Sequence, residues 1–282
     1  DGSNPTFKIC VITDCTASGG DGGGVYCGAG NAVEFADCTF NNNTATYDGG
    51  GIYCGVGNSA EFTDCELRNN TATFDGGGLY YGSEGNSILT RCAFSGNRAE
   101  YGAGIFYNVN CGLSKLTECS FIDNDANEDG GGVLFGVNNL IMVSDCNFTN
   151  NLAQKGAGLY FDPNCGGEIK LSELVGNDAN EDGGAIYIGD CNDIEVNDCD
   201  ISYNTAHHGG GLFCLWSPGS RIIACTIKYN DAAPGLAQGG GIYSFAGPKL
   251  IKDCDISYNT SRTSGGGVYL IGDDDPAFPL GP

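Results

Sequence analysis

Apolar and polar positions alternate with a period of two along this chain, but only over very short stretches. Alternation runs over residues 33–35, kinks at Ala36–Asp37 and resumes over residues 38–40. After a turn at Asn41–Asn43 it returns over residues 50–54. Alternation of this kind is typical of β-strands, whose successive side chains point to opposite faces. The pattern predicts three short strands in this segment, each with one face inward.

The same unit recurs along the chain at steps of 23 to 29 residues, most often 27. A small core residue marks each unit, at Cys15, Cys38, Cys65, Cys92, Cys119, Cys146, Ser172, Cys199, Cys225 and Cys254. Five residues later nine units have an asparagine, at Asn43, Asn70, Asn97, Asn124, Asn151, Asn177, Asn204, Asn230 and Asn259. A glycine-rich triplet and an aliphatic–aromatic pair complete the unit, so the chain has ten of them.

A unit of this length fits a helical repeat, a leucine-rich repeat or a coil of a β-solenoid. No window has the helical spacing of apolar residues, the glycine triplets would break helices, and the L-x-x-L-x-L pattern is absent. We therefore predict an all-β, right-handed parallel β-helix of about ten coils, roughly 48 Å long. The hand follows from the general preference of parallel connections. Residues 1–272 form the single predicted domain, and the acidic, proline-rich residues 273–282 a linker or tail.

Stacked coils place each residue beside its own kind, which explains the residue types. A column of asparagines can pass amide hydrogen bonds along the axis, and asparagine tolerates the left-handed conformation of a corner. Cysteine serves as a small apolar core residue. We expect Asn43 to Asn259 to form a buried structural ladder.

Phe-x-x-Asn occurs at residues 40–43, 94–97, 121–124 and 148–151, and Gly-Gly-Ala-Ile at residues 183–186. These motifs resemble the paired repeat signature of polymorphic outer membrane proteins, which are autotransporter adhesins with β-helical passengers. The likeness extends from about the second coil onward. The resemblance implies an adhesive rod at the cell surface.

The charge narrows the list of partners. Twelve Lys and Arg stand against 35 Asp and Glu, a formal net charge of −23. Such a chain repels phosphate backbones and anionic lipid surfaces, so we expect no nucleic acid partner. No apolar run approaches the ~20 residues of a membrane span, so we expect no membrane insertion. Because the chain begins at Asp1 rather than Met, we expect a mature or excised form.

The sixteen cysteines suggest an oxidising compartment, but most have a simpler explanation. Those of the repeat, together with Cys27, Cys54 and Cys214, fit buried thiols that stack from coil to coil. Cys165 and Cys191 lie in longer loops one coil apart, and we predict a disulfide between them. No C-x-x-C occurs, so a zinc site is not expected.

Acidic residues also form columns. Asp21, Asp48 and Asp75 precede the glycine triplet on consecutive turns. Like charges about 4.8 Å apart repel, and Ca²⁺ would relieve that repulsion. The alternative is that these carboxylates accept hydrogen bonds from backbone N–H groups of the turn. We predict a possible calcium site but no required cofactor.

An aromatic stripe follows the inward aliphatic residue of each triplet. It reads Tyr26, Tyr53, Tyr80, Phe106, Leu134, Tyr160, Tyr187, Phe213, Tyr243 and Tyr269. Residues at this position should point outward, where they could stack on sugar rings or bury against a partner. The alternative is a stack of rings that shields the backbone. A shorter ladder is expected at Tyr203, Tyr229 and Tyr258.

Parallel β-helices also occur as polysaccharide lyases and hydrolases, which need paired carboxylates on one face. The acids here follow the repeat, and none of the local breaks carries a clear acid–base set. We therefore predict a non-catalytic extracellular rod that is structural or adhesive, with a glycan, a surface protein or a second copy stacked end to end as partner. The alternative is a carbohydrate-binding or polysaccharide-degrading β-helix.

Overall fold

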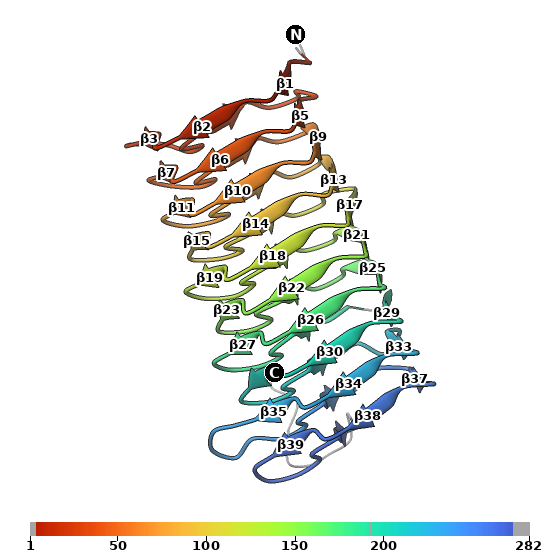
Figure 1. Cartoon of the computed structure of the whole chain (residues 1–282). Coiled ribbons are helices and arrows are strands. Elements are labelled where there is room, and N and C mark those ends of the chain that lie inside the picture. Colours follow the sequence, from red (N-terminus) through yellow and green to blue (C-terminus); the bar gives the residue numbers. More distant parts are fainter. Residues whose placement is uncertain (1–3, 192, 273–282) are drawn as a thin grey trace, which may run out of the picture.

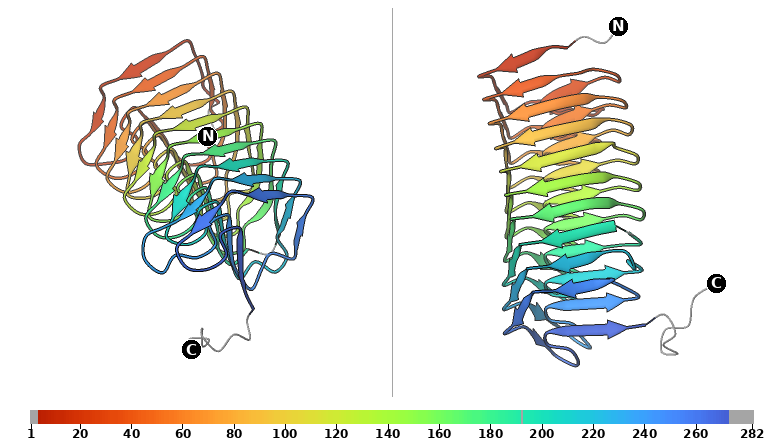
Figure 2. Two further views of the ribbon diagram at one scale, coloured as in Figure 1. Left: turned by 60° about the horizontal axis from the view of Figure 1, so that its bottom comes forward. Right: turned by 90° about the vertical axis from the view of Figure 1, so that its right-hand side faces the viewer.

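The computed structural model describes residues 4–191 and 193–272. Within them every regular element is a β-strand, and together the strands wind into one rod (Figures 1 and 2). The described residues include no helix that is long and apolar enough to cross a membrane. The predicted tail at 273–282 lies outside the described residues.

The strands form four parallel sheets of ten strands each. Every coil contributes one strand to each of the four sheets. Sheet A comprises β1 (Thr6–Lys8), β5 (Glu34–Ala36), β9 (Ser59–Thr63), β13 (Asn86–Thr90), β17 (Leu113–Thr117), β21 (Leu140–Ser144), β25 (Gly166–Lys170), β29 (Asp193–Asn197), β33 (Arg221–Ile223) and β37 (Leu250–Lys252). Sheet B comprises β2 (Val11–Thr13), β6 (Thr39–Asn41), β10 (Glu66–Arg68), β14 (Ala93–Ser95), β18 (Ser120–Ile122), β22 (Asn147–Thr149), β26 (Glu173–Val175), β30 (Asp200–Ser202), β34 (Thr226–Lys228) and β38 (Asp255–Ser257).

Sheet C comprises β3 (Thr16–Ala17), β7 (Thr44–Ala45), β11 (Thr71–Ala72), β15 (Arg98–Ala99), β19 (Asp125–Ala126), β23 (Leu152–Ala153), β27 (Asp178–Ala179), β31 (Thr205–Ala206), β35 (Asp231–Ala232) and β39 (Thr260–Ser261). Sheet D comprises β4 (Val25–Cys27), β8 (Ile52–Cys54), β12 (Leu79–Tyr81), β16 (Ile105–Tyr107), β20 (Val133–Phe135), β24 (Leu159–Phe161), β28 (Ile186–Ile188), β32 (Leu212–Leu215), β36 (Ile242–Phe245) and β40 (Val268–Ile271).

The parallel solenoid of ten coils confirms the predicted fold class, but the prediction of three strands per coil was one too few. The fourth strand is the two-residue element of sheet C, such as β7. Two residues are too few to display an alternation, so the sequence pattern could not reveal it. Single residues with positive φ turn the chain between sheets, such as Asp37 at 53° between β5 and β6 and Asn42 at 56° between β6 and β7.

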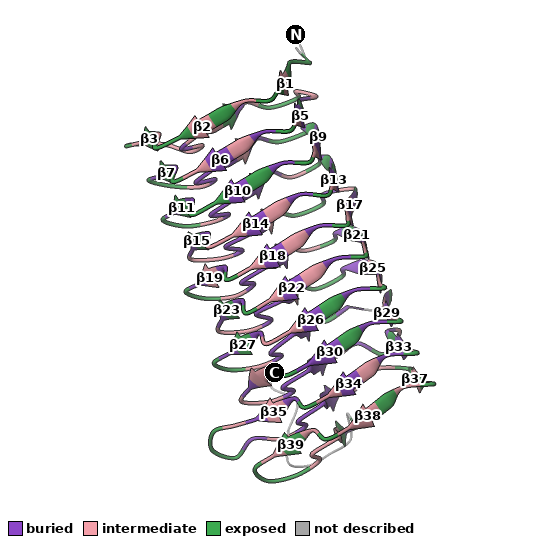
Figure 3. Ribbon diagram, viewed as in Figure 1, coloured by how far each residue is buried: buried purple, intermediate pink, exposed green. Residues whose placement is uncertain are grey.

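The core is made of columns that run along the rod axis (Figure 3). The Phe121 ring, for example, stacks at 4.9 Å on Phe94 and 4.8 Å on Phe148, all three fully buried. Parallel, in-register pairing of the strands of sheet B puts these three identical side chains at this spacing. The repeat therefore lets similar side chains of successive coils pack against one another in the core.

The asparagine ladder is confirmed. Asn97 is fully buried, and its Nδ2 donates to Asn124 Oδ1 at 2.9 Å and to the Leu67 carbonyl at 2.9 Å. The Asn97 backbone N–H donates to the same Asn124 oxygen at 3.2 Å. The pattern repeats from Asn43 to Asn259, so the column satisfies polar groups that would otherwise be buried without partners.

All sixteen cysteines are free thiols, and all except Cys10, Cys15 and Cys254 are buried. Cys165 and Cys191 are therefore not joined by the predicted disulfide in this structure. The Cys165 thiol donates instead to the Gly136 carbonyl at 3.1 Å, and the Cys191 thiol to the Asp162 carbonyl at 3.1 Å. Backbone carbonyls of the preceding coil thus act as partners for thiols that reach the core.

Burial predicts the reactivity of these thiols. In native protein we expect fast reaction with an aromatic disulfide reagent at no more than three thiols, those of Cys10, Cys15 and Cys254, because the other thiols are shielded. In denaturant without reductant we expect all sixteen to react. A total of fourteen, which is sixteen less the two thiols of one bond, would instead indicate a disulfide such as Cys165–Cys191.

Candidate functional site

A column of variable residues, which we call the turn column, runs beside the outer face of sheet D. Each member directly precedes the first glycine of a triplet: Asp21, Asp48, Asp75, Tyr101, Asp129, Lys155, Asp182, His208, Gln238 and Ser264. The glycines that follow all have positive φ, so they turn the chain back toward sheet D. This geometry places the turn column next to the aromatic stripe.

The first acids of the turn column act as backbone acceptors. Asp21 Oδ1 accepts the N–H of Asp48 at 3.2 Å, and Asp48 Oδ1 accepts the N–H of Asp75 at 3.1 Å. Among the described residues no group of three or more His, Cys, Asp and Glu could hold a metal ion. The hydrogen bonds support the capping interpretation of Asp21 and Asp48 but not of Asp75, and calcium binding by Asp21, Asp48 and Asp75 stays a prediction.

The aromatic stripe forms two stacks of rings on the outer face of sheet D. Tyr53 and Tyr80, for example, are 4.8 Å apart with planes inclined by 3°. The first stack comprises Tyr26, Tyr53, Tyr80 and Phe106, and the second Tyr160, Tyr187, Phe213, Tyr243 and Tyr269. Tyr80, Tyr187, Phe213 and Tyr243 are buried, and of all nine rings only Tyr26 is strongly exposed.

This geometry argues against the prediction that the whole aromatic stripe is a binding surface. A ring inside a stack has both faces covered by its neighbours, so it has none to offer a sugar. The self-stacking interpretation is therefore supported over most of the rod. Free ring faces remain only where a stack ends.

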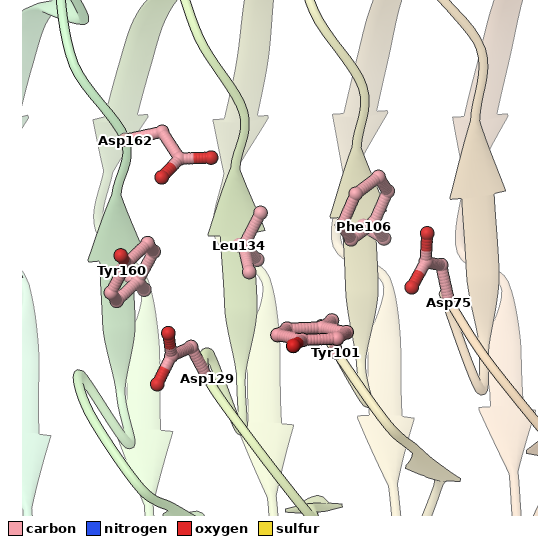
Figure 4. A pocket seen from close by; sticks show the side chains of 7 residues that line it. All are labelled: Asp75, Tyr101, Phe106, Asp129, Leu134, Tyr160 and Asp162. Carbon is pink, nitrogen blue, oxygen red and sulfur yellow. The ribbon is translucent and has the colours of Figure 1, made fainter.

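The two stacks end on either side of Leu134. Phe106 lies on β16, Leu134 on β20 and Tyr160 on β24, and the residues pair in register across these strands. Leu134 is itself only 3% exposed. Around it is a groove of about 280 Å³, lined by Asp75, Tyr101, Phe106, Asp129, Leu134, Tyr160 and Asp162 (Figure 4). The groove combines one ring face from each stack that no second ring covers with three carboxyl groups.

Burial alters the carboxyl groups of the groove. It raises the pKa of Asp75 to about 7, with repulsion from Asp48 and Glu100 adding to the effect. It also raises the pKa of Asp129 to about 6, although attraction to Lys155 opposes the rise. The pKa of Asp162 is likewise raised by burial, while a hydrogen bond with Tyr160 lowers it. No basic side chain lines the groove.

These raised pKa values predict that the rod is more stable in mild acid. Burial also raises the pKa of Asp182 to about 7. The folded chain therefore binds protons at Asp75, Asp129 and Asp182 at a pH where the unfolded chain has lost them. Stability therefore falls as pH rises from about 4 to about 7. Because water screens these half-buried carboxyls, we expect a gain of about 2 kcal/mol on going from pH 8 to pH 5. Denaturant unfolding at both pH values measures it, and a loss of stability at pH 5 would contradict it.

A second set of aromatic rings lies at the corner between sheets B and C. Tyr203, Tyr229 and Tyr258 are exposed and stack at 5.0 and 5.1 Å, as the sequence predicted for a shorter ladder. All three have φ of 57° or 58°, in place of the Asn, Asp or Gly of earlier coils. Their stacking offsets part of the strain of a bulky residue in this conformation.

The groove at Leu134 was not predicted as a site. Asp75, Phe106 and Tyr160 were named, but they were assigned to two separate columns. The available signal was the one aliphatic residue in an otherwise aromatic stripe, combined with Tyr101 in place of an acid one coil earlier. Asp129 stands at the same repeat position as Asp75, directly before a glycine triplet, whereas Asp162 carried no signal. Nothing in a single repeat shows which acids face the stripe.

Comparison with known proteins supports the architecture. A family model described as "Right handed beta helix region" matches residues 1–161 and again residues 131–278. No curated protein matches the chain. Among solved structures the chain is similar to the crystal structure of a TibC-catalyzed hyper-glycosylated TibA fragment, at 13% identity over 96% of this chain and 97% of that one, with a TM-score of 0.18. So low a score carries no argument.

Proposed function

Because this chain belongs to the right-handed β-helix family, we propose that it is a non-catalytic extracellular rod that adheres to carbohydrate through the groove at Leu134. The observation that carries the proposal is the interruption of the aromatic stack inside an acidic groove. The resemblance to autotransporter adhesins agrees with this proposal. An adhesin role of that kind, end-to-end assembly and a surface protein partner all stay predictions.

The lining has the two kinds of group that carbohydrate sites use. Flat aromatic faces cover the C–H faces of sugar rings, and Phe106 and Tyr160 each have one face that no neighbouring ring covers. Carboxylates accept hydrogen bonds from hydroxyls, and no described residue donates a hydrogen bond to the carboxyls of Asp75 or Asp129. Few, well-placed polar groups on an apolar floor are the general form of a small-ligand site.

Polysaccharide hydrolysis is the alternative function. Asp75 and Asp129 precede equivalent turns two coils apart, so their backbones lie roughly 9.6 Å apart. Inverting glycosidases hold two carboxyls about 6.5–9.5 Å apart, one of them protonated, and Asp75 has a pKa of about 7. Release of reducing ends from a bound polysaccharide would favour this alternative, and its loss in Asp75→Asn would assign it to the groove.

The substitution Leu134→Phe tests the adhesive proposal. A phenylalanine would continue the stripe and fill the groove, so we expect binding on a glycan array to fall at least tenfold. Stability should be unchanged or higher, because a ring would join both stacks at about 0.5–1.5 kcal/mol per pair. Net charge is unaltered, so the change isolates the shape of the groove.

Leu152→Phe is the matched control, because Leu152 is 44% exposed on β23, in sheet C. It should leave glycan binding intact. Equal binding by the original protein and Leu134→Phe would refute the groove as the adhesive surface.

A further inference from the structure

We infer that the groove at Leu134 holds a single protonated amino-sugar ring, which takes the place of the missing ring between Phe106 and Tyr160. This assignment rests on the proposed function and specifies the class of carbohydrate ligand that the groove binds. It follows from two independent features, the spacing of the stacks and the charge of the lining.

The spacing leaves room for one ring. Successive rings of the stripe lie 4.8 to 5.5 Å apart, close to the separation of the strands that carry them. Phe106 and Tyr160 are two strands apart, so their rings are separated by roughly 9.6 Å. Leu134 sits at the same register but has a shorter side chain, which leaves the outer part of its level open as the groove (Figure 4).

The thickness of that space suits a sugar. A pyranose carries axial hydrogens on both faces, and its carbons contact the carbons of an aromatic ring at about 3.5–4.0 Å. A ring placed midway between Phe106 and Tyr160 would lie close to 4.8 Å from each, the separation already present between neighbouring rings. Both faces of the sugar would then be covered.

The charge of the lining selects a cation. Asp75, Asp129 and Asp162 line the groove, and no basic side chain does. The nearest cation of the turn column, Lys155, is paired with Glu181 at 3.3 Å. An ammonium group among three carboxyls would favour their ionised forms and gain attraction in a site partly shielded from water. A neutral sugar leaves the repulsion among the three carboxylates in place, and an acidic sugar adds to it.

Isothermal titration with two matched tetrasaccharides tests the inference. One is the fully deacetylated glucosamine tetramer, which carries ammonium groups, and the other is its N-acetylated counterpart. We expect the deacetylated tetramer to bind at least tenfold more tightly at neutral pH. Asp162→Asn, which keeps size and removes one charge, should weaken its binding and leave that of the N-acetylated tetramer nearly unchanged.

Leu134→Phe separates the groove from the general negative charge of the rod. Its formal charge remains −23, so any diffuse attraction of a cationic sugar persists, whereas the groove is filled. We expect tight binding to disappear in Leu134→Phe and to persist in Leu152→Phe. Binding that survives Leu134→Phe would overturn the inference.

The remaining outcomes distinguish the inference from the proposed function. Equal affinity for the two tetramers, with loss of both in Leu134→Phe, would overturn the preference for an amino sugar and leave carbohydrate binding in place. A second outcome would have the same consequence: neither tetramer binds, but another glycan on an array does, and Leu134→Phe abolishes that binding. The absence of binding to any glycan would overturn both.

Discussion

Asn124→Ala is expected to lower the free energy of unfolding by about 3–5 kcal/mol. Asn124 Oδ1 accepts the side-chain amide of Asn97 at 2.9 Å and its backbone N–H at 3.2 Å. Its Nδ2 donates to the Phe94 carbonyl at 3.1 Å and to Asn151 Oδ1 at 2.9 Å. Alanine would remove all four bonds at a site with no exposure, and would leave a small cavity. Unpaired groups that no water can reach carry their full desolvation cost.

Denaturant unfolding followed by circular dichroism measures this loss. Because each coil contacts only its neighbours, hydrogen exchange should show the largest increase in the coils of Asn97, Asn124 and Asn151. Asn127→Ala, an exposed asparagine three residues along the same coil, is the control and should cost less than about 0.5 kcal/mol. Equal effects of the two substitutions would refute the ladder as a source of stability.

Gly183→Ala is expected to be similarly damaging, at about 3–5 kcal/mol. An added Cβ would lie 2.5 Å from the carbonyl oxygen of Ile186, which is backbone and cannot move aside. Positive φ alone does not demand glycine in this rod, since Asp123 adopts 55° and Tyr203 adopts 58°. The close approach of the turn to its own carbonyl is what excludes a side chain. All ten coils accordingly have glycine at this position.

Gly166→Ala is the matched control. The nearest atom to its added Cβ would be Leu140 Cδ2 at 3.6 Å, an ordinary contact, and its φ is not positive. We expect a change below about 1 kcal/mol, measured by the same unfolding experiment. If Gly183→Ala proved as mild as Gly166→Ala, the turn could relax, and the glycine column would need another explanation.

Much of the architecture could be read from the residues alone, because stacking makes the sequence a direct record of the fold. The spacing of Asn43, Asn70 and Asn97 sets the length of a coil, and their chemistry places them inside. The buried position of the repeated cysteines could be predicted in the same way, since a small apolar residue recurs at the same tight corner of successive coils. Such a column can be predicted without knowing any distant contact, because each residue in it contacts the equivalent residue of the next coil.

Exposure and pairing could not be read in this way. Alternation predicts that Tyr80 and Tyr187 point away from the core, yet both are buried, because each is covered by the neighbouring rings of its own stack. The predicted Cys165–Cys191 disulfide depended on loop position, and in the structure backbone carbonyls hold both thiols.

The groove at Leu134 shows the same division most clearly. A leucine in an aromatic column is visible in the sequence, but its consequence depends on how far each side chain reaches and on which acids the turns bring alongside. Asp129 and Asp162 approach Leu134 from separate segments, a turn and the end of β24. Their meeting is a property of the closed coils, since the identity of a residue gives its chemistry whereas the winding of the chain gives its neighbours.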